Sequence, residues 1–179
     1  MNSKQQAVAI EYALDRVPYS DLIRVGLDPC GEPGFVTTEL REALASHDRG
    51  SVECMLALAY RHELLNAEHA SLLAALLLES WHHSHEDLAH ALERLRDPAT
   101  VDILARAAVM KHDYLAYDDS HAFARKCAWA LADIGTPAAR SHLERLAHHA
   151  DPELAAYAQE RLANWESELG RKAGGEPTV

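Results

Sequence analysis

Apolar residues recur at helical spacing along most of the chain, most clearly between residues 128 and 165. Gly135 suits the left-handed residue that ends a helix, and Pro137 suits the first turn of the next helix. Two further stretches, separated by an Asp-Pro turn, carry apolar residues three or four positions apart. These residues are Leu143, Leu146, Leu154, Ala158, Leu162 and Trp165. We therefore predict a helical hairpin in this part of the chain.

The same spacing predicts helices in the rest of the chain, separated by turns that contain Gly, Pro, Asn or Asp. The predicted helices span residues 4–17, 37–46, 51–65, 67–80, 86–96, 98–111 and 121–134. A short turn is expected near residues 20–25, and Ser51 is expected to cap the helix that it begins. The helix at residues 67–80 is so rich in leucine that we expect it to be covered on most sides.

A second stretch of the chain repeats this pattern about 39 residues earlier. The matching pairs are Ala91 and Ala130, Leu92 and Leu131, Leu95 and Ile134, and Pro98 and Pro137. Over about residues 87–165 the chain therefore resembles the HEAT-type repeats of bacterial HEAT-repeat proteins. The resemblance implies an all-α fold, a right-handed α-solenoid of HEAT-like helical hairpins with about 8–9 helices. It also implies that second helices, such as residues 123–134 and 153–165, line the concave side.

Length and composition fit one structural domain, because a chain of 179 residues of which 48% are hydrophobic can form a sizeable core. We predict that residues 1–35 form an N-terminal helix and a Gly/Pro loop packed on the solenoid. Residues 36–168 would carry the HEAT-like helical repeats, and residues 169–179 would form a disordered tail. The sequence shows no bilayer-spanning apolar run, no secretory signal pattern and only three, widely spaced cysteines, which predicts a cytoplasmic location.

The charge balance is strongly acidic, with 17 Lys and Arg against 28 Asp and Glu and a net charge of −11. Proteins that grip DNA or RNA need a positive surface, because neutralising phosphates supplies much of their affinity. We therefore expect no direct nucleic-acid binding. An acidic surface suits a basic protein partner, since charge complementarity speeds the encounter. The alternative is that the acidity only keeps the protein soluble.

The strongest candidate for partner binding is a loop at residues 111–120, where the first repeat is about eight residues longer than the second. Its aromatic and acidic side chains are Asp113, Tyr114, Tyr117, Asp118 and Asp119. Tyrosine is frequent in binding hot spots, and carboxylates pair with Lys or Arg of a basic partner. Trp81 is a further candidate, either for an interface or for the core. Alternatively, the tyrosines tuck under the loop and the aspartates only cap the helix that begins at His121.

A histidine cluster is the main candidate for other chemistry. His82, His85, Glu86 and His90 lie close in sequence, and Glu86 and His90 share one helix face, as a pair of metal ligands does. No His-Glu-x-x-His motif is present, so a solvated polar joint is the favoured interpretation, and we expect no metal or other cofactor.

Two His-Glu dipeptides, at His62 and His85, resemble the iron-binding motifs of the deoxyhypusine hydroxylases, which are HEAT-repeat proteins. That family carries four such motifs in two symmetric halves, whereas this chain has two. The sequence also lacks a Gly-x-Ser-x-Gly turn, a cysteine in a recognisable context with histidine, and a glycine loop that cradles phosphate. We therefore expect no catalytic residues and no enzyme activity.

These observations predict a protein-binding HEAT-like module with no membrane contact. The most specific hypothesis is an immunity-type protein that binds and neutralises a cognate, basic toxin, based on the small size, the acidity and the loop at residues 111–120. Two alternatives stay open. One is a metal-dependent enzyme or enzyme subunit that uses the histidine-rich residues 82–90, and the other is a general scaffold or regulator.

Overall fold

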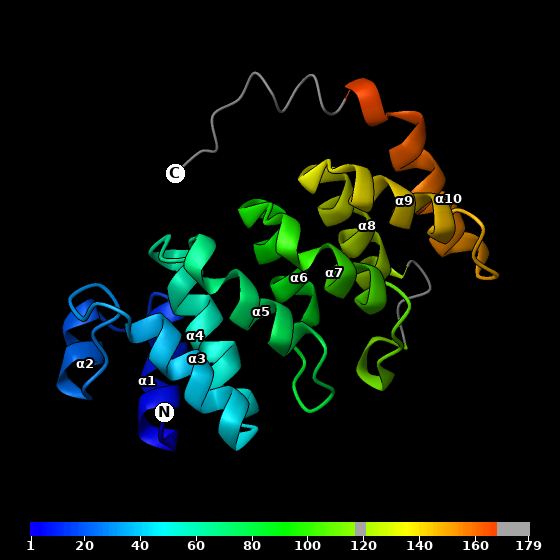
Figure 1. Cartoon of the computed structure of the whole chain (residues 1–179). Helices are drawn as coiled ribbons and strands as arrows, with labels where there is room; N and C mark the ends of the chain where they lie inside the picture. Colours follow the sequence, from blue (N-terminus) through cyan, green and yellow to red (C-terminus); the bar gives the residue numbers. More distant parts are fainter. Residues whose placement is uncertain (117–120, 168–179) are drawn as a thin grey trace. The chain divides into compact units, whose positions relative to one another are not determined.

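The computed structural model describes residues 1–116 and 121–167 (Figure 1). These residues form ten α-helices and three short 3-10 helices, and they contain no strand. The all-α prediction is confirmed. One helix more than expected arises because residues 19–24, in the stretch expected to be a short turn, form a helix of their own. The predicted tail at residues 169–179 lies outside the described residues.

The chain divides into two compact units. Unit 1 comprises Met1–Leu72 with Trp81–Ser84, and unit 2 comprises Leu73–Ser80 with His85–Val179. The boundary between the two units falls within helix α5 (Ala70–Leu77). Its Leu73, Leu76 and Leu77 are fully buried, as the leucine-rich pattern predicted. None of the helices in the described part of the chain is long and apolar enough to cross a membrane.

Unit 1 is built from the first four helices and one 3-10 turn. These elements are α1 (Ser3–Ala13), α2 (Tyr19–Arg24), α3 (Phe35–Ser46), α4 (Arg49–Arg61) and η1 (Ala67–His69). The core between them is made of leucines and other apolar residues that solvent does not reach: Leu22, Leu27, Leu40, Val52, Met55 and Leu58. Helix α1 ends before the predicted residue 17, because Asp15 adopts a left-handed conformation with φ of 58° and forms an ion pair with Arg61 of α4.

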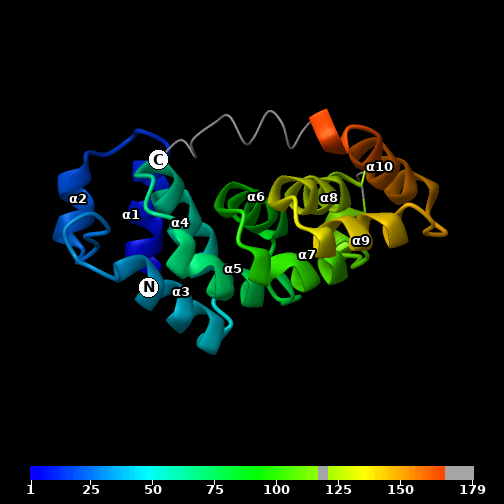
Figure 2. The same cartoon turned by 45° about the horizontal axis from the view of Figure 1, so that its top comes forward.

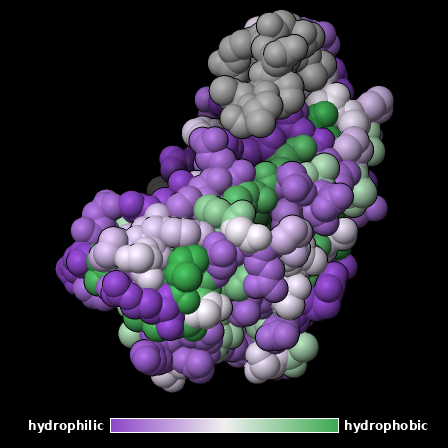
Figure 3. Space-filling model, turned by 90° about the vertical axis from the view of Figure 1, so that its left-hand side faces the viewer, coloured by the Kyte–Doolittle hydropathy of each residue, from purple (hydrophilic) through white to green (hydrophobic). Residues whose placement is uncertain are grey.

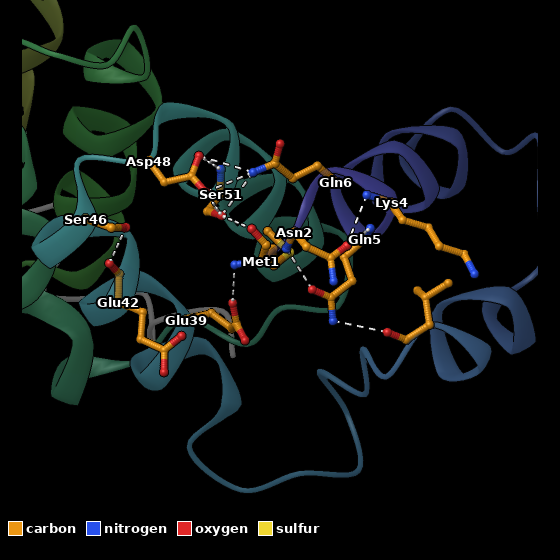
Figure 4. A network of polar contacts seen from close by, with 11 residues as sticks. Met1, Asn2, Lys4, Gln5, Gln6, Glu39, Glu42, Ser46, Asp48 and Ser51 are labelled. Atoms are coloured by element: carbon orange, nitrogen blue, oxygen red, sulfur yellow. Dashed lines mark hydrogen bonds and ion pairs between the residues drawn. The ribbon is translucent and has the colours of Figure 1, made fainter.

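A polar network fixes the start of α4 against α1 (Figure 4). The Asp48 carboxylate accepts hydrogen bonds from the Ser51 amide (3.2 Å) and hydroxyl (2.7 Å) and from Nε2 of Gln6 (3.0 and 3.1 Å). Burial alone would raise the pKa of Asp48, but these hydrogen bonds outweigh it and the pKa is lowered. The predicted cap was therefore wrong: Asp48 caps α4, and Ser51 lies inside the helix with 1% of its surface exposed.

Unit 2 contains the remaining elements. They are α6 (His85–Leu95), η2 (Pro98–Thr100), α7 (Val101–Ala107), η3 (Asp113–Leu115), α8 (Ala122–Ile134), α9 (Pro137–Leu146) and α10 (Pro152–Ala163). Helices α6, α8 and α10 lie side by side in one layer, and α7 and α9 form a second layer against them (Figure 2). Their apolar stripes meet between the layers, where Leu88, Leu92, Leu104, Cys127, Leu131 and Leu143 are completely buried.

The predicted hairpin is present as α9 and α10, and local chemistry sets its ends. Gly135 ends α8 with φ of 68°, and the side chains of Thr136 and Asp151 cap α9 and α10. Each cap is followed by a proline in the first helical turn. The connection between α7 and α8 spans residues 108–121, whereas the one between α9 and α10 spans only residues 147–151. The longer connection is the insertion inferred from the repeat.

Candidate partner-binding surface

Tyr114 belongs to η3 of unit 2, and its hydroxyl contacts His85 at the start of α6. The Tyr114 Oη and His85 Nδ1 are 2.8 Å apart, and the other ring nitrogen of His85 is 2.7 Å from the Glu79 carbonyl oxygen. A carbonyl only accepts, so Nε2 carries a proton, and in the neutral ring Nδ1 then accepts the hydrogen bond that the tyrosine donates. His85 has no exposed surface. Tyr114 therefore holds its loop to α6.

Two further rings complete this group, which we call the His85 cluster: His85, His112, Tyr114 and Phe123. The centroid of the His112 ring is 3.7 Å from that of His85 and 5.4 Å from that of Phe123. Phe123 also meets His85 edge to face at 5.6 Å. Sequence analysis did not predict these contacts, because the residues come from three elements far apart along the chain.

The other residues predicted in this loop are placed differently. Asp113 is exposed to solvent, and Tyr117, Asp118 and Asp119 lie outside the described residues. Asp113 lines a cavity of about 350 Å³ beside the N-terminal ends of α8 and α10. His121 and Asp151, 3.4 Å apart, also line this cavity.

Trp81 lies in unit 1 and is partly buried. Its ring stacks on His47 at 5.2 Å and meets His82 edge to face at 5.0 Å. His82 is fully buried, and its Nδ1 accepts a hydrogen bond from the Ser84 amide at 3.1 Å. The indole of Trp81 therefore packs against its own unit over part of its surface.

The metal-ligand candidates are engaged with other protein groups. Glu86 forms an ion pair with Lys126 of α8 at 2.8 Å, and His90 lies 3.2 Å from a carboxylate oxygen of Glu93. His85 uses both ring nitrogens, as described above, and His82 belongs to unit 1 rather than to unit 2. Within residues 1–116 and 121–167, no group of three or more His, Cys, Asp or Glu is arranged to hold a metal ion.

The second His-Glu dipeptide lies in an aromatic group of unit 1, which we call the His62 cluster: Tyr12, Tyr19, Arg61 and His62. Tyr12 Oη and His62 Nε2 are 2.9 Å apart and the two rings stack, while Tyr19 meets both rings edge to face. The guanidinium of Arg61 lies 4.5 Å from the centre of the Tyr12 ring. Burial and the positive charge of Arg61 lower the pKa of His62, which favours its neutral form.

The surface that sequence analysis missed is centred on Trp129 of α8. Large exposed hydrophobic residues are few in the described chain, and Trp129, 37% exposed, is the aromatic one among them. Two guanidinium groups flank its ring, Arg125 at 5.5 Å and Arg161 at 5.4 Å, and Arg125 also lies 5.9 Å from the ring of Tyr157. We call these four residues from α8 and α10 the Trp129 cluster. Figure 3 shows another face of the molecule, where green, hydrophobic residues interrupt a largely purple, hydrophilic surface.

The repeat offset shows why this cluster differs from its neighbour. Residues of α6 that are 39 positions earlier carry Glu86 and His90 where α8 carries Arg125 and Trp129. The buried positions keep the same character, since Leu92 and Leu131 are both fully buried. The repeat therefore preserves the core and varies the solvent-facing positions. The spacing of Arg125 and Trp129, four residues apart on one helix face, was the available signal.

Comparison with known proteins supplies the family. Residues 123–149, which span α8, α9 and the turn after it, match the model of the PBS lyase HEAT-like repeat. The chain carries a HEAT-like repeat. The match confirms the resemblance drawn from the sequence and includes both Arg125 and Trp129. No curated protein and no solved structure matches the chain. HEAT-like repeats are helical modules that mediate protein interaction, so the exposed face of this one is a candidate partner-binding surface.

Proposed function

We propose that this HEAT-like repeat protein is an immunity-type protein, which binds a cognate, basic toxin and blocks it without catalysing a reaction. Support comes from the repeat, whose usual work is to hold another protein, and from the net charge of −11, which favours encounter with a basic partner. The binding surface of the proposal is the solvent-facing side of α6, α8 and α10.

One observation carries the proposal: a partly exposed tryptophan lies in the middle of this face and is surrounded by charged and aromatic side chains. Trp, Tyr and Arg are the residue types that are enriched in binding hot spots. Next to this cluster, Asp87 of α6 is exposed to solvent, while Glu86 beside it is paired with Lys126. An exposed carboxylate such as that of Asp87 suits Lys or Arg of a basic partner.

The test is co-expression of the full chain with each small basic protein encoded beside its gene. We expect one of these proteins to be toxic alone, to lose its toxicity in the presence of this chain, and to elute with it as a 1:1 complex. Failure of every such protein to form a complex would contradict the proposal. Relief of toxicity without a complex would contradict it as well, because blocking by binding requires one.

A matched pair of substitutions assigns the surface. Trp129→Ala removes the centre of the cluster and is expected to weaken the complex by about 2 kcal/mol, or roughly 30-fold in Kd. Ile23→Ala, which truncates a residue of unit 1 that is 44% exposed, is expected to leave the Kd unchanged. Isothermal titration calorimetry of both variants against the purified partner measures the difference. Equal Kd values for the two variants would show that the partner binds elsewhere.

A further inference from the structure

Arg125 is the feature of the Trp129 cluster that partner binding in general does not explain. Two other basic residues of α8 and α10 form ion pairs: Lys126 with Glu86 at 2.8 Å, and Arg161 with Glu160 at 2.6 Å. Arg125 forms no ion pair with any described residue, and its Nε atom is buried without an acceptor in the described part of the chain. A buried donor without an acceptor costs free energy, so this arrangement calls for a reason.

The surroundings of Arg125 hold its guanidinium in place. The group lies between the Trp129 ring at 5.5 Å and the Tyr157 ring at 5.9 Å, so residues from two helices position it. A guanidinium that is held by aromatic rings and has no carboxylate partner among residues 1–116 and 121–167 is well suited to bind a carboxylate through two parallel hydrogen bonds. The adjacent exposed part of the indole provides an apolar contact for the residue beside that carboxylate.

We propose that the Trp129 cluster binds a partner segment in which an Asp or Glu adjoins an apolar side chain, with the carboxylate on Arg125 and the apolar group on Trp129. This inference rests on the proposed function in that it assumes protein binding, and it deepens it by naming the chemistry of the contact. The segment is a local acidic feature of a partner that is basic overall.

The charges on α6 limit what else fits. Asp87 is exposed on α6, the helix next to α8, and Glu86 beside it is paired with Lys126, while the whole chain has a net charge of −11. A long polyanion such as a nucleic acid would bring phosphates against these carboxylates. A short peptide segment places its single carboxylate on Arg125 and avoids them. Charge complementarity therefore favours an acidic peptide segment over a nucleic acid.

The experiment is selection of binding peptides from a phage-displayed random library on the purified full chain. We expect enriched peptides to share an Asp or Glu next to an apolar residue. Synthetic copies, measured by fluorescence anisotropy, should bind Arg125→Glu at least about tenfold more weakly than wild type. Arg125→Lys, which keeps the charge but not the paired hydrogen bonds, should show a smaller loss.

The matched control is Arg106→Glu, which makes the same charge change at an exposed residue of α7, in the other layer of unit 2. Peptide affinity should not change in this variant, and thermal melts should show that all variants fold. Absence of enrichment, enrichment of basic peptides or of peptides without a carboxylate, or equal losses in Arg125→Glu and Arg106→Glu would each overturn the inference. Enrichment of single-stranded DNA in a parallel selection, lost in Arg125→Glu, would overturn it in favour of a nucleic acid.

The two proposals fail in different ways. If a complex with a basic toxin forms and survives Arg125→Glu, the toxin-binding function stands and the carboxylate contact is wrong. If no toxin is bound but acidic peptides depend on Arg125 as described, the contact stands and the immunity role is wrong.

Discussion

The two His-Glu dipeptides, His62 with Glu63 and His85 with Glu86, look alike in the sequence and have the same first contact in the structure. Each histidine is hydrogen-bonded to a tyrosine hydroxyl, His62 to Tyr12 at 2.9 Å and His85 to Tyr114 at 2.8 Å. In both cases the tyrosine comes from another element of the same unit. In each unit the histidine of the dipeptide therefore links two elements through this hydrogen bond, and we call each such link a joint.

The difference between the two joints is their burial and their second contacts. His85 is fully buried and uses both ring nitrogens, one of them with the Glu79 carbonyl. His62 is partly exposed and lies beside the charged Arg61. A buried joint with every polar atom paired loses much when one partner is removed, whereas a half-exposed joint lets water replace the partner. Stability should therefore respond more strongly at His85 than at His62.

The largest expected effect is that of His85→Ala. The substitution removes a buried ring and leaves the Tyr114 hydroxyl and the Glu79 carbonyl without their partner, at a cost of about 2–4 kcal/mol. His90→Ala on the same helix is the matched control, because its side chain is 50% exposed, and it should cost less than about 0.5 kcal/mol. Urea unfolding, followed by hydrogen exchange of the α6 amides, measures both. Equal losses would contradict a structural role for His85.

The next effect compares the two tyrosines. Tyr114→Phe removes the donor to the buried His85 and should cost about 1–2 kcal/mol, while Tyr12→Phe should cost about 0.5–1 kcal/mol because water can reach His62. Hydrogen exchange should speed up near residues 112–116 in the first variant and near α1 in the second. The reverse order of losses would show that burial does not decide the strength of these joints.

How much of this could be foreseen depends on the range of each interaction. The ends of α8, α9 and α10 follow from Gly135, Pro137 and Pro152, since caps and turns are decided by residues adjacent in sequence. The start of α4 lies two residues before the predicted one because Asp48 accepts the capping hydrogen bond from the Ser51 amide, and Asp48 also gains a hydrogen bond from Gln6 of α1, 42 positions away. Local patterns contain no information about such a partner.

The candidate site shows the same limit. Asp113 and Tyr114 were chosen for their residue types, and the structure leaves Asp113 exposed but joins Tyr114 to a histidine 29 positions away. The contact of the Tyr114 hydroxyl with His85 agrees with the alternative interpretation, in which this tyrosine tucks under the loop; Tyr117 lies outside the described residues. The sequence analysis does not single out Trp129, because helical spacing alone does not show how much of its side chain the neighbouring helices cover. Only the packing of α10 beside α8 shows that its ring stays partly in solvent between two arginines.

The smallest effect, and the one specific to unit 1, is a dependence of stability on pH at His62. Burial and Arg61 lower the pKa of this histidine in the folded state below its unfolded value of 6.5. Between the folded and the unfolded pKa of His62, the unfolded chain binds more protons than the folded chain. His62 therefore contributes stability above about pH 6.5 that is lost as the pH falls through the folded pKa. Thermal melts between about pH 7.5 and 5 should show this decline, and His62→Gln should flatten it. His90→Gln is the control, and its melts should keep the wild-type slope. A slope that His62→Gln leaves unchanged would place the titrating group elsewhere and remove the electrostatic difference between the two joints.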